Sequence, residues 1–140
     1  MSAEESRAFM DVAIDSGVNY IDLYDPNPVV RDNVGYAIKG RTDKMMVQGH
    51  IGVFWKDGQY VRTRDVDTAR MGFEDMLQRL GVDCIEVGMM HIFDKMEDWD
   101  ALEATAKPYW DYVQQLKAEG KIKHIGMSTH NAQVALAAAK

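Results

Sequence analysis

The side chains in this sequence that can carry acid–base chemistry stand at regular places along it. Asp22, His50, His91 and Ser128 each lie at or just beyond the end of a short apolar run that is typical of a buried strand. A histidine titrates near pH about 6.5 and can share a proton with a carboxylate such as Asp22. Ligands of parallel α/β folds bind where the strands end, so these positions predict one shared site for proton transfer.

The helices and strands that must position these residues alternate along the chain. Ser2 and Glu5 have the spacing of a capping box, which opens a first helix that Gly17 ends. Runs of β-branched, aromatic and other apolar residues predict strands at 18–23, 44–48, 84–90 and 121–127. Helical spacing of apolar residues predicts further helices at 29–39, at 66–80, at 101–119 with an interruption near Pro108, and at 134–139.

Strands separated by helices predict an α/β fold with parallel strands, because each crossover returns the chain to the same end of the sheet. Between the second and third strands, Asp57-Gly58 lies within a short aromatic segment and predicts an inserted hairpin at about 53–64. Trp55 and Tyr60 of this segment can line a substrate mouth, but aromatic residues on hairpins more often pack on each other. We expect a single domain over residues 1–140.

Composition excludes several classes of protein. The 140 residues are 46% hydrophobic and 27% charged, as in a soluble globular domain, and the net charge of -6 argues against nucleic acid or an anionic membrane as a partner. The single cysteine, Cys84, cannot form an internal disulfide, which favours a reducing, cytoplasmic location. No apolar run approaches the roughly 20 residues of a spanning helix, and the acidic start does not match a signal peptide.

Several sequence blocks, in their order and spacing, resemble the aldo-keto reductases. The block GVNYID at 17–22 is followed by GYAI at 35–38, and LGVDCIE at 80–86 leads to His91. The block LKAEGKIKHIGMS at 116–128 is similar to the family's strand GK-I-R-x-I-G-x-S. Within the family, the chain resembles a bacterial subgroup whose full-length members look like fusions of the barrel to a ferredoxin-like iron–sulfur tail.

The resemblance implies a (β/α)₈ barrel, of which this chain corresponds to about strands 2–5, so we expect a partial TIM barrel. It implies reduction of a small-molecule aldehyde or ketone by hydride transfer from NADPH or NADH. Such a barrel needs about 250 residues, and its last loops build the phosphate-binding site. We therefore expect the isolated chain to lack the main cofactor anchor and to be inactive alone, while its parent is an oxidoreductase.

The family uses a Tyr as proton donor, a Lys that lowers the pKa of that Tyr, an Asp that pairs with the Lys, and a His that orients the carbonyl. Asp22 matches the Asp, and His91 matches the His. Asn27 stands at the Tyr position and His50 at the Lys position, so acid–base chemistry here needs different residues. Tyr24, two residues after Asp22, is the candidate for the missing phenol.

Two further residues are candidates for cofactor binding by resemblance. Ser128 matches the fifth-strand Ser that hydrogen-bonds the nicotinamide carboxamide, and Thr129 stands where the family has an Asn.

Two other classes of function remain open. Asp22, His50 and His91 have the residue types of a three-ligand zinc site in a hydrolase, although no H-x-H or H-E-x-x-H pair accompanies them. Alternatively, the chain is a non-catalytic half-barrel that self-associates as a homodimer, because an open parallel sheet exposes its edges.

Overall fold

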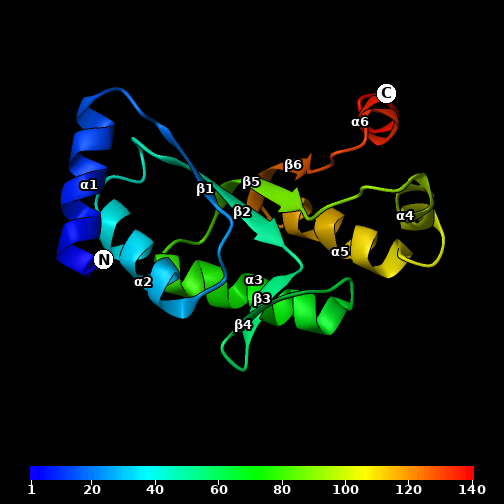
Figure 1. Cartoon of the computed structure of the whole chain (residues 1–140), viewed down its shortest axis with the longest axis horizontal. Coiled ribbons are helices and arrows are strands. Elements are labelled where there is room, and N and C mark those ends of the chain that lie inside the picture. Colours follow the sequence, from blue (N-terminus) through cyan, green and yellow to red (C-terminus); the bar gives the residue numbers. More distant parts are fainter.

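A computed structural model describes all residues, 1–140, as an α/β fold (Figure 1). The elements in chain order are α1 (Ala3–Asp15), β1 (Tyr20–Leu23), α2 (Pro28–Ile38), β2 (Met46–Ile51), β3 (Val53–Lys56), β4 (Gln59–Arg62), α3 (Val66–Leu80), β5 (Ile85–Met90), α4 (Met96–Asp100), the 3₁₀ turn η1 (Ala101–Glu103), α5 (Lys107–Ala118), β6 (Ile122–Met127) and α6 (Ala132–Ala138).

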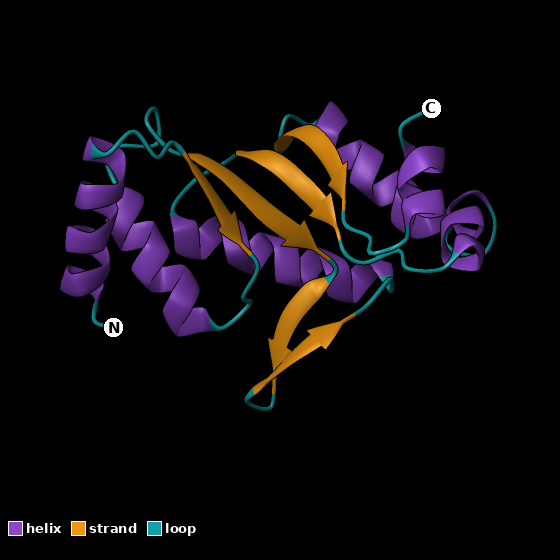
Figure 2. Ribbon diagram, turned by 45° about the horizontal axis from the view of Figure 1, so that its top comes forward, coloured by secondary structure: helices purple, strands orange, loops and turns teal.

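The main sheet has four parallel strands in the order β1-β2-β5-β6 (Figure 2). Each strand of this sheet lies beside the next one along the chain, and the order never reverses. An open doubly wound sheet places its ligand at such a reversal, whereas a (β/α)₈ barrel has none. The topology is therefore that of part of a barrel, as the sequence predicts.

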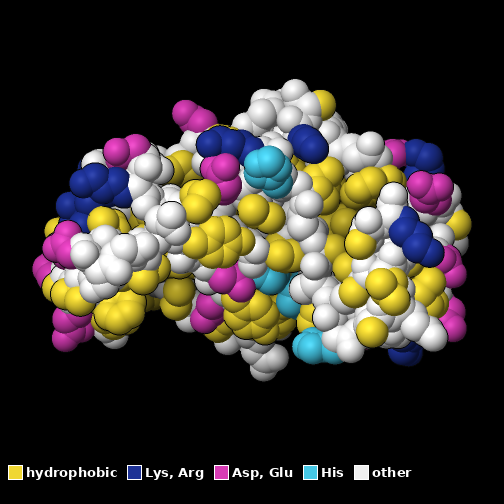
Figure 3. Space-filling model, turned by 90° about the horizontal axis from the view of Figure 1, so that it is seen from above, with side chains coloured by type: hydrophobic (Ala, Val, Ile, Leu, Met, Phe, Trp, Pro, Cys, Tyr) yellow, Lys and Arg dark blue, Asp and Glu magenta, His cyan; other side chains and the backbone are white.

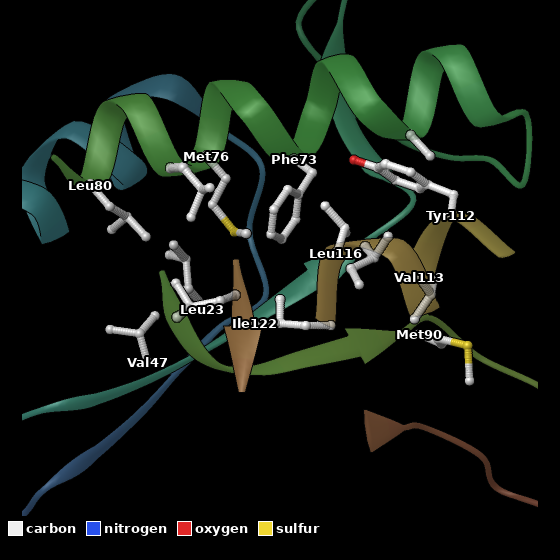
Figure 4. Close-up of a cluster of buried hydrophobic side chains, with 14 of the residues drawn as sticks. Leu23, Val47, Phe73, Met76, Leu80, Met90, Tyr112, Val113, Leu116 and Ile122 are labelled. Carbon is white, nitrogen blue, oxygen red and sulfur yellow. The ribbon is translucent and has the colours of Figure 1, made fainter. Parts of the chain in front are cut away.

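Helices α2, α3 and α5 cover one face of this sheet and form the core with it (Figure 2). Figure 4 shows Phe73 and Met76 of α3 above Ile122 and Leu23 of the sheet, and all four side chains are buried. Asp65 accepts a hydrogen bond from the Thr68 amide at the start of α3, and Gly81 ends the helix with a φ of 66°. These caps fix the bounds of α3 where the sequence predicts them.

The opposite face of the sheet carries no helix and is partly exposed. Tyr20 of β1 is 41% exposed and Met46 of β2 is 38% exposed, and both belong to this open face. In the view from above Figure 1, hydrophobic side chains occupy the middle of the molecule with histidine and acidic side chains beside them (Figure 3). β1 and β6 each have one unpaired edge.

A hairpin formed by β3 and β4 extends from the carboxyl end of β2 (Figure 2). Gly52 joins β2 to the hairpin with a φ of 85°, a conformation that favours glycine. Val53 is buried at the base, and its carbonyl lies so close to α3 that a Cβ on Gly72 would come within 2.7 Å of it. The hairpin base is therefore packed on α3, while its Asp57-Gly58 tip is free of neighbours at Gly58.

Several sequence predictions were wrong in their details. The first strand begins at Tyr20 rather than at residue 18. The second strand begins at Met46 rather than at residue 44, and it continues to Ile51, so that His50 lies inside it. The single helix predicted at 101–119 is three elements: α4, η1 and α5. Pro108 does not interrupt a helix but lies in the first turn of α5, where its missing N–H leaves no hydrogen bond unmade. No helix has the length and apolar character needed to cross a membrane.

Candidate active site

The register of the parallel strands brings three of the predicted residues together. Asp22 pairs with Gln48, which is two residues before His50. His50 pairs with Met89, which is two residues before His91. Because side chains alternate between faces along a strand, Asp22, His50 and His91 all project from one face of the sheet. This is the open face, since the neighbouring position Gly49 faces Met76 of α3.

These side chains form a continuous hydrogen-bonded series with a fourth residue. Nε2 of His50 lies 2.9 Å from Oδ1 of Asp22, and the two Nδ1 atoms of His50 and His91 are 3.1 Å apart. Nε2 of His91 lies 2.6 Å from the hydroxyl of Tyr60. We refer to Asp22, His50, His91 and Tyr60 as the four-residue network. Its inner part is buried, with only 6% of the His50 side chain exposed, and its Asp22 end is half-exposed.

From the sequence, Tyr60 is a candidate for the substrate mouth but has no assigned part in the acid–base chemistry. It lies on β4, opposite Trp55 of β3. The Asp57-Gly58 turn predicts the hairpin, but nothing in the local pattern tells which way the hairpin leans. The hairpin leaves the carboxyl end of β2, and in the folded chain the phenol of Tyr60 lies within hydrogen-bond distance of His91 (Figure 2). The sequence did contain one signal for Tyr60. This tyrosine lies two residues beyond a tight turn, and the predicted site lacks the tyrosine that the family uses as proton donor.

Tyr24 lies beside the network without a hydrogen bond to its histidines. Its ring stacks on the Tyr60 ring at 5.2 Å between centroids and meets the His50 ring edge-on at 5.6 Å. Half of Tyr24 is exposed, so it covers the network on the solvent side. Asn27 caps α2 by accepting a hydrogen bond of 3.0 Å from the Val29 amide. The residue at the family's tyrosine position is thus occupied with helix capping.

The acceptor and donor properties of the four groups fix where the protons lie. The Asp22 carboxylate only accepts, so Nε2 of His50 donates to it. When His50 is neutral, its Nδ1 accepts from Nδ1–H of His91. Nε2 of His91 then has no proton and accepts from the hydroxyl of Tyr60. Every donor therefore points toward Asp22, and the series ends on a negative charge.

Burial and nearby groups shift the pKa values of His91 and Tyr60, the two residues at one end of the network. Desolvation, and then the nearby His50, lower the pKa of His91 to about 4. Desolvation, and then the neighbouring Tyr24, raise the pKa of Tyr60 above its usual range. Both groups are therefore neutral near pH 7, with His91 as an acceptor and Tyr60 as a hydroxyl donor.

The two candidate cofactor residues follow β6 and have different contacts. Oγ of Ser128 accepts from the Ile92 amide at 2.9 Å, and its own proton has no acceptor in the protein. The hydroxyl of Thr129 donates to the Phe93 carbonyl at 2.6 Å and accepts from the Asn131 amide at 2.9 Å. Ser128 thus keeps a free donor that fits a carboxamide oxygen, whereas Thr129 is used in holding the loop.

The three residues considered as zinc ligands, Asp22, His50 and His91, do not have the geometry of a metal site. No group of three His, Cys, Asp or Glu side chains has the arrangement needed to hold a metal ion. The ring nitrogens of His50 face Asp22 and His91 rather than a common centre. This geometry disfavours the zinc hydrolase alternative on the basis of ligand directions.

Comparison with known proteins identifies the family. The model of the Aldo/keto reductase family matches residues 1–140. The chain belongs to the aldo/keto reductase family. A solved chain from Pseudomonas aeruginosa that is assigned to the aldo-keto reductases superposes with a TM-score of 0.83 at 26% identity, over 99% of this chain and 53% of that chain.

Two more distant structures support the fold. Aldo-keto reductase AKR11C1 from Bacillus halodurans, in its holo form, has a TM-score of 0.78 at 22% identity, over 96% of this chain and 44% of that chain. An aldo/keto reductase from Klebsiella pneumoniae, solved with NADP and acetate, has a TM-score of 0.71 at 20% identity, over 97% and 43% of the two chains. This chain thus spans about half the length of these members of the family.

Proposed function

We propose that the protein containing this chain reduces an aldehyde or ketone with a nicotinamide cofactor, and that Tyr60 gives the proton to the carbonyl oxygen. The observation that carries the proposal is the four-residue network, which joins a phenol through His91 and the buried His50 to a carboxylate at the carboxyl ends of the strands. Carbonyl reduction leaves a negative charge on the substrate oxygen, and a positioned phenol can neutralise it.

The network can deliver a proton without leaving a charge on Tyr60. When His50 carries a second proton on Nδ1, it donates to Nδ1 of His91, and the His91 proton then lies on Nε2 and points to the Tyr60 oxygen. This turns the Tyr60 hydroxyl toward the substrate. As Tyr60 releases its proton to the substrate oxygen, it takes one from His91, and His91 takes one from His50. The network ends neutral at both histidines, with Asp22 still ionised.

His50 takes the role that a lysine has in the family. A protonated His50 forms an ion pair with the Asp22 carboxylate across the 2.9 Å contact between them. Unlike a lysine, His50 has a second nitrogen that faces His91. We therefore assign the proton reservoir to His50, the transfer step to His91 and the donor to Tyr60. Tyr24 packs on the donor and shields it.

The cofactor assignment rests on the family and on one free donor. The Klebsiella pneumoniae structure contains NADP, and the free hydroxyl proton of Ser128 suits a carboxamide oxygen. A reduced nicotinamide, when bound, supplies the hydride. The iron–sulfur tail of the resembling bacterial subgroup stays a prediction about the parent protein, as does its cytoplasmic location.

The deciding experiment compares Tyr60→Phe with Tyr24→Phe in the complete parent protein. NADPH consumption is followed with a simple aldehyde such as 4-nitrobenzaldehyde. We expect Tyr60→Phe to lower kcat by about 10²- to 10⁴-fold, the range for loss of a general acid. Tyr24→Phe keeps the ring that stacks on Tyr60, and we expect a change below about threefold. Loss of activity in Tyr24→Phe alone would assign the donor to Tyr24 instead.

Cofactor binding is tested separately by nicotinamide fluorescence on the 140-residue chain and on the parent. We expect NADPH to bind the parent, and binding to the short chain to be weak. Saturable micromolar binding by the short chain would mean that its residues form a nucleotide site by themselves.

A non-catalytic, self-associating chain is the second candidate. The open face of the sheet, with the exposed Tyr20 and Met46, is the observation in its favour. Sedimentation of the short chain over a hundredfold range of concentration distinguishes the two: a mass that rises with concentration supports a homodimer, and a constant mass of 15.9 kDa contradicts it.

A further inference from the structure

A pocket of about 450 Å³ lies next to the four-residue network, on the side of the hairpin base. His91 forms part of its wall, together with Gly52 and Arg64. Pockets of roughly 300–1,000 Å³ hold small-molecule ligands. The pocket is therefore large enough for a small organic molecule whose reacting atom lies at the network.

The walls of this pocket are rich in positive charge. Arg62, Arg64 and Lys95 face it, together with Asp94 and Asp98. Both carboxylates are already engaged: Asp94 accepts from the His130 amide at 2.7 Å and from its ring, and Asp98 lies 3.4 Å from Arg64. The negative charges in the pocket are thus committed to partners within the protein.

Two of the three cations lack such a partner. Arg64 is fixed, since it donates to the Ile92 carbonyl at 3.0 Å and lies over the Phe93 ring at 4.3 Å. Arg62 and Lys95 form no ion pair with any carboxylate of the chain. Both belong to the wall of one pocket, so their positive charges lie at the same place on the molecule. An anion can therefore bind there without displacing an internal ion pair.

Arg62 is placed by the same strand that places the proposed donor. Tyr60 and Arg62 lie two residues apart on β4, so their side chains project from the same face of the hairpin. Their Cα atoms are about 7 Å apart along an extended strand. An anionic group held by Arg62 thus lies within the length of a small molecule from the Tyr60 hydroxyl.

We propose that this pocket binds an anionic group, a carboxylate or a phosphate monoester, on the carbonyl substrate, with Arg62 and Lys95 as its ligands. The inference rests on the proposed reductase function and specifies its substrate class: aldehydes or ketones that carry an acid a few bonds from the carbonyl. Guanidinium and ammonium groups form charge-assisted hydrogen bonds with both anions. The bound acid fixes the carbonyl at the donor end of the network.

The test uses three aldehydes of one shape with the complete parent protein. 4-Carboxybenzaldehyde and 4-formylphenyl phosphate carry the anion, and 4-formylbenzamide is the neutral control. We expect kcat/KM to be at least about tenfold higher for one or both anionic aldehydes, a factor typical of one charge-assisted hydrogen bond. Which anion gives the larger ratio identifies the substrate group. Equal values for all three aldehydes would overturn the proposal.

Charge-removing variants locate the effect. Arg62→Gln and Lys95→Gln should each lower the preference for the anionic aldehyde by about tenfold, mainly through KM. Lys56→Gln is the matched control, because it removes a charge from the same hairpin at an exposed position away from the pocket. We expect Lys56→Gln to keep the preference. If Arg62→Gln raised the KM for NADPH and left the aldehyde preference unchanged, the charges would bind the cofactor rather than the substrate. That result would overturn the proposal.

A binding measurement separates this inference from the proposed function. If the parent reduces none of the aldehydes, the reductase proposal fails. Calorimetric titration of benzoate and phenyl phosphate then still tests the pocket. Saturable binding of either anion that is weakened by Arg62→Gln and by Lys95→Gln supports the anion site, and absence of binding to the unsubstituted protein contradicts it.

Discussion

The main sheet and the β3–β4 hairpin hold their parts of the four-residue network in different ways. Asp22, His50 and His91 stand on strands that pair along their length and pack against three helices. Tyr60 stands on a two-stranded hairpin that contacts the rest of the molecule mainly at its base. Two-stranded hairpins are marginal by themselves, so the position of Tyr60 depends on how that base is held.

Because of this difference, we expect substitutions in the two regions to affect different properties, stability in one case and activity in the other. Substitutions in the helix-covered core should lower the free energy of unfolding, because they remove packing that the whole sheet shares. Substitutions at the hairpin base should act first on the distance between Tyr60 and His91.

The largest expected effect on stability is in the core under α3. Phe73 is 1% exposed between α3 and the sheet (Figure 4). Phe73→Ala should lower the free energy of unfolding by about 3–5 kcal/mol in urea denaturation. Phe9→Ala, at a position that is 67% exposed, should change it by less than about 0.5 kcal/mol. Equal losses at both positions would contradict the assignment of the core.

At the hairpin base, the critical position is Gly52. A Cβ there would lie 2.4 Å from the Thr63 carbonyl, so Gly52→Ala must move β3 relative to β4. We expect kcat of the parent to fall by about tenfold or more, because a misplacement of about 1 Å can cost 10²-fold. Gly58→Ala is the control: its φ is also positive, at 77°, but nothing lies within 4 Å of its Cβ. Equal loss in both would show that backbone strain, rather than the contact with Thr63, controls Tyr60.

His91 connects the two regions and predicts a pH dependence. Its pKa is about 4 in the folded protein, mainly because of desolvation, and ordinary, about 6.5, when unfolded. Between these values the unfolded chain binds a proton that the folded chain does not, so stability falls as the pH drops from about 6.5 to about 4. His91→Gln should lose less stability than the original protein between pH 7 and pH 4.5, measured by urea midpoints. His124→Gln, at an exposed site without a hydrogen-bond partner, should behave like the original.

The smallest effect concerns the hydroxyl that supports the junction of sheet and hairpin. Tyr109 is buried and donates a hydrogen bond of 3.0 Å to the Ile51 carbonyl, next to Gly52. Tyr109→Phe should lower the free energy of unfolding by about 1–2 kcal/mol. The buried hydroxyl of Tyr112 has no hydrogen-bond partner, so Tyr112→Phe should be neutral or slightly stabilising. A reversed order of the two variants in urea denaturation would contradict these assignments.

Much of the fold could be predicted because it follows local rules. The capping box at Ser2 and Glu5 is present, and α3 begins and ends where its caps indicate. The helix predicted at 101–119 failed, because apolar spacing alone does not show that Pro108 belongs to a first turn. The extension of β2 through His50 was also missed, because the polar side chains Gln48 and His50 are buried only by residues distant in the sequence.

The alternation of strands and helices, the family, and the placement of Asp22, His50 and His91 at strand ends could all be predicted from the sequence. This was possible because side chains alternate along a strand and parallel strands end at the same edge. The contact of Tyr60 with the network, and the pocket that Arg62 and Lys95 share, could be seen only in the folded chain. Those contacts depend on the direction in which the hairpin leaves the sheet, and this direction is set by packing against α3 rather than by any local pattern.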